Sequence, residues 1–391
     1  MTETTLFLIE TGLHLDIPTL DSLPASTLPI WGDYFFLDFF LSNFSSPHLP
    51  RRILILEGEH RKAQSFINAA WKRKQVEVLP LAKGMREFIN VLKEETSERV
   101  ILSATSYVGV FKWNEVEKLV ASPSEDHIKV SVDGIPSDLY ILKRMHLIDL
   151  LIEHENRFHK SKNFPDLLFN EILLSSFDTL ENIPGHMIFK NNLMQLYREN
   201  ILLLERQKLP DFQAILRNLS QSTLERSQSY VGEKAYIRRS FIASDVEIQG
   251  FVENSILFPG VVVGRKTKII NSVIMNNNQV GRGAVIQNAL IFPYQKEVKK
   301  GAFNIGNDAI IGGPASTAKN NDYPNQINGG ITVIGCSAEV PRGVSIEPGC
   351  YLDGGANRNQ LRNLKKLKRG RSLFSDESTI SEQAKESQDA L

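Results

Sequence analysis

The second half of the chain repeats an aliphatic position every six residues, a spacing that fits neither an α-helix nor a β-strand. The repeated positions, with one slip of a single residue after the third, are Val263, Ile269, Met275, Val280, Ile286, Phe292 and Val298. A six-residue step with one inward aliphatic residue is typical of a parallel β-helix, in which three short strands form a coil and the coils stack. The pattern therefore predicts a β-helix over residues 233–355.

Two segments of this half break the six-residue pattern. Residues 312–330 are rich in Gly, Asn and Pro, which predicts a loop that protrudes from one coil. Residues 356–373 carry seven basic and no acidic side chains, whereas residues 374–391 carry five acids and one lysine. We expect residues 356–391 to form a polar, partly helical and mostly disordered tail.

The first half has a different rhythm, in which short aliphatic runs alternate with helix-like stretches. The runs cover residues 51–56, 76–81, 99–104, 128–134 and 139–143, and the helix-like stretches include 60–74 and 85–95. This order predicts an α/β domain over residues 1–200, with a largely parallel sheet covered on both faces. Residues 201–232 read as a segment that connects this domain to the first coil.

Composition removes several classes of function. Lys plus Arg and Asp plus Glu both number 45 in 391 residues, so no global charge recruits nucleic acid or a membrane. The two cysteines, Cys336 and Cys350, are too few for a disulfide framework or a thiolate metal cage, which suits a cytoplasmic location. The start of the chain resembles neither an export signal nor a membrane span. All eight histidines lie at or before His186, which argues against acyl transfer by a β-helix histidine.

Three stretches carry a resemblance to a known family. They are LPIWGDYFFLDFFLSNF at 28–44, GMREFI at 84–89 and VENSILFPGVVVG at 252–264. By these motifs and their order along the sequence, the chain resembles the ADP-glucose pyrophosphorylase family of sugar-1-phosphate nucleotidyltransferases. The resemblance implies an α/β fold made of a Rossmann-like, GT-A-like nucleotidyltransferase domain and a left-handed β-helix. The family activity is glucose-1-phosphate adenylyl transfer.

The residues that this chemistry requires are largely missing. Nucleotidyl transfer needs a glycine-rich phosphate loop, cations for the phosphates and carboxylates for Mg²⁺. The stretch after the first predicted strand, residues 10–26, has one glycine, Gly12, and residues 1–50 contain no Lys or Arg. By the resemblance, Thr105 and Asn163 stand where the family has metal-binding aspartates. Gly84, Met85 and Glu87 are the remnant of its sugar-nucleotide pocket.

These losses predict no catalytic residue, no metal and no cofactor. The chain looks closest to the non-catalytic D-type subunit of glycogen biosynthesis, a pseudoenzyme that acts as a regulatory or structural subunit. We expect a homo-oligomer, or a hetero-oligomer with a catalytic ADP-glucose pyrophosphorylase subunit, and no nucleic-acid or membrane partner. A sugar-phosphate or nucleotide effector would need cations, and the candidates are Arg51, Arg52, Arg238 and Arg239. The alternative interpretation is that these four are ordinary solvated surface arginines.

Two other functions stay open from the sequence. A divergent but active nucleotidyltransferase would bind Mg²⁺ through Asp166 or Asp138, and it would make ADP-glucose and pyrophosphate. A stand-alone binding or scaffold protein would use the insertion at 312–330 and the basic tail.

Overall fold

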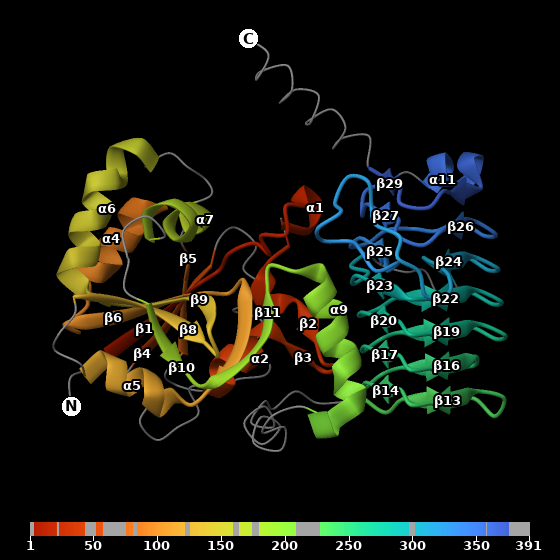
Figure 1. The fold of residues 1–391 in the computed structure, drawn as a ribbon, viewed down its shortest axis with the longest axis horizontal. Helices are drawn as coiled ribbons and strands as arrows, with labels where there is room; N and C mark the ends of the chain where they lie inside the picture. Colours follow the sequence, from red (N-terminus) through yellow and green to blue (C-terminus); the bar gives the residue numbers. More distant parts are fainter. Residues whose placement is uncertain are drawn as a thin grey trace, which may run out of the picture.

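The computed structural model shows an α/β domain beside a stack of short strands, with one long helix between them (Figure 1). It describes residues 4–21, 23–43, 52–57, 76–80, 84–121, 126–158, 164–173, 180–208, 227–296, 302–356 and 358–374. The helix between the two parts is α9 (Leu193–Leu202). The helix expected at 60–74 lies outside the described residues.

The α/β domain is built on one seven-stranded sheet in the order β10-β8-β9-β6-β1-β4-β5. The strands are β1 (Thr4–Ile9), β4 (Arg52–Glu57), β5 (Val76–Pro80), β6 (Arg99–Ala104), β8 (His127–Val132), β9 (Ile135–Lys143) and β10 (Leu180–Ile183). Every neighbouring pair is parallel except the two that involve β9. The Rossmann-like, largely parallel sheet predicted from the aliphatic runs is therefore confirmed.

Helices cover both faces of this sheet, as expected for strands that are apolar on both sides. One face packs against α4 (Met85–Glu94), α6 (Arg144–Phe158) and α7 (Phe164–Leu167), and the other against α2 (Phe36–Asn43) and α5 (Trp113–Ala121). Smaller elements are α1 (Pro18–Asp21), the hairpin β2 (Pro29–Ile30) and β3 (Tyr34–Phe35), and the antiparallel pair β7 (Tyr107–Phe111) and β11 (Gly185–Lys190).

The second part consists of three parallel sheets that fit a left-handed β-helix, which confirms the predicted fold class. The first sheet holds β12 (Tyr230–Val231), β15 (Glu247–Ile248), β18 (Val262–Val263) and β21 (Gln279–Val280). The second holds β13 (Tyr236–Arg238), β16 (Phe251–Glu253), β19 (Lys268–Ile270), β22 (Val285–Gln287), β24 (Ile310–Gly312), β26 (Ser345–Ile346) and β28 (Lys366–Leu367). The third holds β14 (Phe241–Ile242), β17 (Ile256–Leu257), β20 (Val273–Ile274), β23 (Ala289–Ile291), β25 (Thr332–Ile334), β27 (Tyr351–Leu352) and β29 (Ser372–Leu373).

The third β-helix sheet is buried on both faces. In β17, Leu257 points into the coil interior, whereas Ile256 belongs to the apolar cluster formed with α9 and the α/β domain. The next strand repeats the arrangement with Ile274 inside and Val273 outside. This double burial explains why the sequence has unbroken apolar runs here, while the other two sheets show one inward residue per strand.

An asparagine ladder forms the corner between the second and third sheets. Asn254, Asn271 and Asn288 all have positive φ, at 46°, 47° and 51°, a conformation that asparagine tolerates better than other side chains. The Asn254 amide donates to Asn271 Oδ1 at 2.6 Å, and the Asn271 amide donates to Asn288 Oδ1 at 3.3 Å. The Asn-Ser pairs of the sequence therefore mark the corners of stacked coils.

The β-helix continues past the predicted boundary at 355, so the expected tail from 356 is wrong for its first part. After helix α11 (Arg358–Leu364), β28 pairs with β26 and β29 pairs with β27, which adds a further coil. Leu361 and Leu367 are buried in the coil interior, and Leu373 packs against it. These three leucines are spaced six residues apart, as in the rest of the β-helix. The seven basic residues around them, however, give the segment a composition typical of a disordered tail.

The loop insertion, residues 313–330 between β24 and β25, connects the β-helix to the α/β domain. The Gln326 side chain accepts from the Leu193 backbone N–H at 3.1 Å and donates to the Asn191 carbonyl at 3.2 Å. Tyr323 packs edge-on against Tyr351, with ring centroids 5.7 Å apart. The insertion is therefore part of the interface at the start of α9.

Two substitutions of Asn271 test the ladder. We expect Asn271→Ala to reduce the free energy of unfolding by about 1 kcal/mol more than Asn271→Gly, because both lose the side-chain hydrogen bonds but only alanine is strained at positive φ. Urea unfolding of the two purified variants measures the difference. An alanine variant as stable as the glycine variant would contradict a left-handed corner at this position.

Candidate functional site

The edge formed by the carboxyl ends of β1 and β6 is where a sheet of this topology binds ligands. The sheet order places β4 and β5 on one side of β1 and β6 on the other, so the connections reverse direction between β1 and β6. In open α/β sheets, ligands bind in the crevice at such a switch point. The segments that follow these two strands, residues 10–28 and 105–106, therefore decide what the edge can do.

In this protein the two strand ends are joined to each other by hydrogen bonds. The Thr105 hydroxyl accepts from the Thr11 backbone N–H at 3.1 Å, and the Thr105 N–H donates to the Ile9 carbonyl at 3.1 Å. Thr105 is fully buried and Thr11 is almost fully buried. Thr105 thus fastens the loop after β1 onto the end of β6.

The loop after β1 is an apolar segment packed against the β-helix. Leu13, Leu15, Ile17 and Leu20 are fully buried, and they share one cluster with residues of α9, of the third β-helix sheet and of the insertion. Between them, His14 and Asp16 adopt positive φ. The buried residues Leu13, Leu15 and Ile17 alternate with these two, although the segment is not assigned as a β-strand. We call residues 11–20 the apolar plug.

The single glycine of this segment is required by packing. A Cβ on Gly12 would lie 2.3 Å from the Asp21 carbonyl oxygen, so only glycine fits against α1. The Asp21 carboxylate accepts from the backbone N–H groups of Leu15 at 2.6 Å and Ile17 at 3.1 Å. Burial raises the pKa of Asp21 above its ordinary value, and these two hydrogen bonds partly offset the rise. The backbone groups of the plug therefore bind an internal carboxylate.

The predicted remnant of a sugar-nucleotide pocket begins α4. Gly84 has φ of 64° and precedes the helix, which requires a glycine-like conformation. Met85 is buried in the core with Phe7 and Ile9 of β1, while Glu87 is half-buried. Methionine at this position therefore extends the core under the sheet.

Of the four arginines predicted to bind an anion, the structure describes the side chains of Arg238 and Arg239. Arg238 forms an ion pair with Glu253, and Arg239 forms one with Glu205 at 2.7 Å. Arg51 lies outside the described residues, and only the backbone of Arg52 is described, in β4. The α4 remnant and β13 lie on opposite sides of the molecule (Figure 1).

The described residues at this edge do not fit a magnesium nucleotide. The hydroxyl of Thr105 is buried and already accepts a backbone hydrogen bond, and a neutral hydroxyl is a weak ligand for Mg²⁺. Asp138 is half-buried, and its carboxylate accepts from the Ser106 hydroxyl at 3.4 Å. Asn163 lies outside the described residues, and so does the side chain of Asp166. Within the described ranges, no three His, Cys, Asp or Glu side chains form a metal-binding group.

Residues of the 28–44 motif instead hold the two parts of the molecule together. The Trp31 backbone N–H donates to Asn200 Oδ1 at 2.9 Å, and the Trp31 indole donates to the Glu199 carbonyl at 3.1 Å. The Asp33 carboxylate accepts from both the N–H and the hydroxyl of Ser244, at 2.9 and 2.8 Å. The sequence carried no signal for these partners because they lie more than 160 residues away.

The polar residues of α2, the helix within this motif, have structural roles. Asp38 accepts from the Phe35 backbone N–H at 2.8 Å and thereby caps the start of α2. Asn43 donates to the Gly109 carbonyl at 2.8 Å and accepts from the Phe111 N–H at 3.1 Å. These contacts cap α2 and join it to β7.

Comparison with known proteins gives matches in both parts of the chain. Residues 225–334 match the family model "GlmU-like, C-terminal hexapeptide". Glucose-1-phosphate adenylyltransferase of Acetivibrio thermocellus is 31% identical over 124 residues, which are 32% of this chain and 27% of that protein. The enzyme of the same name from Desulforamulus reducens is 26% identical over 319 residues, or 80% of this chain and 72% of that protein. The one from Clostridioides difficile is 25% identical over 244 residues, or 60% and 58% of the two chains.

The fold and these similarities define a nucleotidyltransferase-like chain with a hexapeptide β-helix. They support the ADP-glucose pyrophosphorylase family that the sequence motifs indicated. No helix in the described part of the chain has the length and apolar character needed to span a bilayer.

Replacement of Gly12 tests the packing of the plug. We expect Gly12→Ala to lower the free energy of unfolding by about 2 kcal/mol, because its Cβ would overlap the Asp21 carbonyl and push the loop from the sheet edge. The matched control is Gly109→Ala, whose Cβ would make only ordinary contacts at 3.7 Å or more. Chemical unfolding of both variants measures the effect, and equal stability would show that the loop is not tightly packed.

Proposed function

We propose that this chain is a non-catalytic homologue of glucose-1-phosphate adenylyltransferase that acts as a regulatory or structural subunit in glycogen biosynthesis. The observation that carries the proposal is the apolar plug. Four fully buried aliphatic side chains follow β1, at the position where a nucleotidyltransferase needs a flexible glycine-rich loop with free N–H groups. A triphosphate would have to displace this packing, and it would meet no cation in residues 1–50.

The chain's overall structure supports a role through contacts with other subunits. The described residues form the α/β sheet, the β-helix and an apolar interface between them, and the loop after β1 is packed into that interface. The described residues thus form the fold, whereas Thr105 stands where the resemblance implies a metal-binding aspartate. We infer a cytoplasmic assembly, either a homo-oligomer or a hetero-oligomer with a catalytic glucose-1-phosphate adenylyltransferase of the kind that the chain resembles.

Activity and assembly measurements on the full chain test the proposal. We expect the purified chain to release no pyrophosphate from ATP, glucose-1-phosphate and Mg²⁺ above background, because the segment after β1 is not a glycine-rich loop and residues 1–50 offer the triphosphate no Lys or Arg. When it is co-expressed with the catalytic homologue from the same genome, we expect one co-eluting assembly whose kinetics differ from those of the homologue alone. The catalytic homologue by itself is the control for the assay.

Two outcomes would overturn the proposal. Pyrophosphate release by the chain alone, retained through repeated purification, would favour the divergent enzyme, and Asp166 and Asp138 would be the residues to replace. A chain that neither turns over substrate nor associates with the homologue would favour a stand-alone binding protein. Light scattering of the chain alone separates a monomer from the expected oligomer.

A further inference from the structure

A notch interrupts the first corner of the β-helix because the second coil is two residues shorter than its neighbours there. In the first, third and fourth coils, four residues connect the first sheet to the second, for example Gly264 to Thr267 between Val263 and Lys268. In the second coil only Gln249 and Gly250 do so. The corners on either side of the short one project past it and leave a groove of about 800 Å³.

Gly250 forms the floor of this groove for a steric reason. A Cβ at this position would lie 2.6 Å from the Thr267 carbonyl oxygen and 2.9 Å from that of Gly264. The short corner is therefore pressed against the third coil and cannot rise into the space. A groove of this volume lies within the range of small-molecule sites in proteins.

The groove is strongly basic, and its cations form no ion pairs within the part of the chain that the structure describes. Its lining includes one acid, Glu233, and five basic side chains, all exposed: Lys234, Arg265, Lys266, Lys268 and Arg282. None of the five forms an ion pair with any residue in the described ranges. The register explains this for Lys268, whose neighbours on the adjacent coils are the uncharged Phe251 and Val285.

The row of basic side chains in the groove is about as long as a small ligand. The cations come from the first, third and fourth coils, which at a strand spacing of about 4.8 Å cover about 14 Å. Arg265 is held in the groove by a hydrogen bond from its Nε to Gln249 Oε1 at 3.0 Å. At the next corner Asp308 pairs with Arg342 at 3.3 Å, so the uncompensated charge ends at Arg282.

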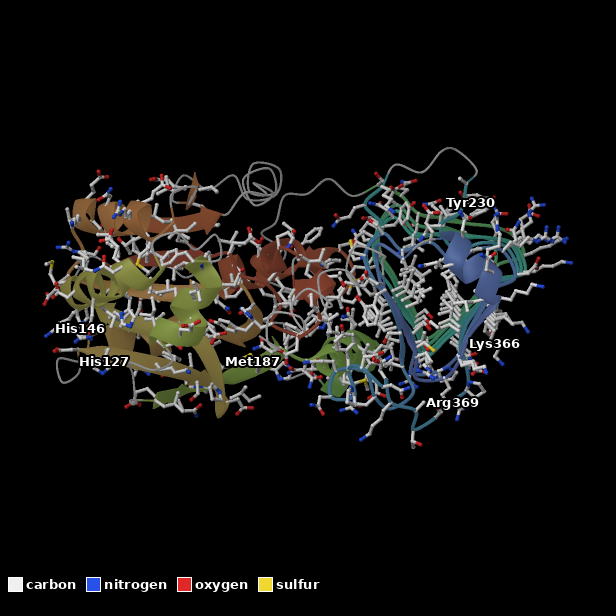
Figure 2. The ribbon with its side chains drawn as sticks, turned by 90° about the horizontal axis from the view of Figure 1, so that it is seen from above. His127, His146, Met187, Tyr230, Lys366 and Arg369 are labelled. Atoms are coloured by element: carbon white, nitrogen blue, oxygen red, sulfur yellow. The ribbon has the colours of Figure 1, made fainter. Side chains whose placement is uncertain are left out.

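Aromatic rings line the other end of the groove. Tyr236 stacks on Phe251 with ring centroids 5.2 Å apart and an angle of 8° between the planes. Tyr236 is 53% exposed and Tyr230 is 60% exposed, and the labelled Tyr230 lies at the surface of the β-helix (Figure 2). Because β13 is the first strand of its sheet, no further rung covers the outer face of Tyr236 within the described residues. A flat, exposed ring beside a row of cations suits a planar base joined to phosphates.

We propose that this groove binds a nucleoside polyphosphate, with the phosphates along Lys234, Arg265, Lys268 and Arg282 and the base stacked on Tyr236. The site lies on the β-helix, separate from the sealed edge of the α/β domain, and the inference does not rest on the proposed subunit function.

Calorimetric titration of the full chain at low salt with EDTA tests the ligand chemistry. We expect ATP to bind more tightly than ADP, and ADP more tightly than AMP, because each phosphate adds contacts with cations. Adenosine should show no binding, and inorganic tripolyphosphate should bind at least tenfold more weakly than ATP because it has no ring. Absence of ATP binding, or equal affinities of tripolyphosphate and ATP, would overturn the proposal. So would an RNA oligonucleotide that binds more tightly than ATP, which would point to a polymer.

Groove variants locate the site. We expect Lys268→Ala with Arg282→Ala to weaken ATP binding at least tenfold, and Tyr236→Leu to bring the affinity of ATP to that of tripolyphosphate. The matched control is Arg362→Ala with Lys365→Ala, which removes two exposed cations of the last coil and should leave binding unchanged. Insertion of two serines between Gln249 and Gly250 restores the four-residue corner and should abolish binding, with thermal unfolding as the check on folding. ATP affinity that is unchanged in all groove variants would place the nucleotide elsewhere and refute the assignment.

Discussion

Burial of the third β-helix sheet on both faces is the constraint on which the rest of the structure depends. Its inward residues fill the coil, and its outward residues join one apolar cluster with α9, the insertion and the loop after β1. Burial of apolar area is the dominant favourable term in folding, so a cluster of this extent fixes the two parts relative to each other. Polar contacts such as Asp33 with Ser244 then set the register of the interface.

The same cluster also includes the loop at the sheet edge where a nucleotidyltransferase would bind its substrate. A phosphate-binding loop must leave its N–H groups free and must move when the nucleotide enters, whereas four aliphatic side chains of the plug are fully buried and two of its N–H groups donate to Asp21. One segment cannot serve as a core element and as a mobile cradle. The interface thus gains apolar surface from the segment that a nucleotidyltransferase would use for its substrate.

Much of the fold could be predicted from the sequence, because it depends on local repetition. The step of six predicted the β-helix, and the aliphatic runs predicted the parallel sheet. The prediction failed at the last coil, where Leu361, Leu367 and Leu373 keep the period but basic residues dominate the composition. The neutral hydroxyl of Thr105 at the end of β6 could also be identified from the sequence, since it depends on residue type. The sealing of the edge could not, because the partners of the plug lie hundreds of residues away in the β-helix.

Charge placement shows why the ion-pairing of a cation could not be judged from the sequence. Arg238 looked available, but stacking of the coils puts Glu253 directly beside it in register, and the two form an ion pair. Lys268 looked ordinary, but the same stacking places Phe251 and Val285 beside it. In a β-helix the neighbours of a side chain are one coil away, so corner lengths decide which charges meet. The missing two residues at Gln249–Gly250 are visible as a spacing of 15 between Ile248 and Val263, against 17 between Val263 and Val280. Comparison of the corner lengths coil by coil, rather than of charges along the sequence, would have indicated the groove.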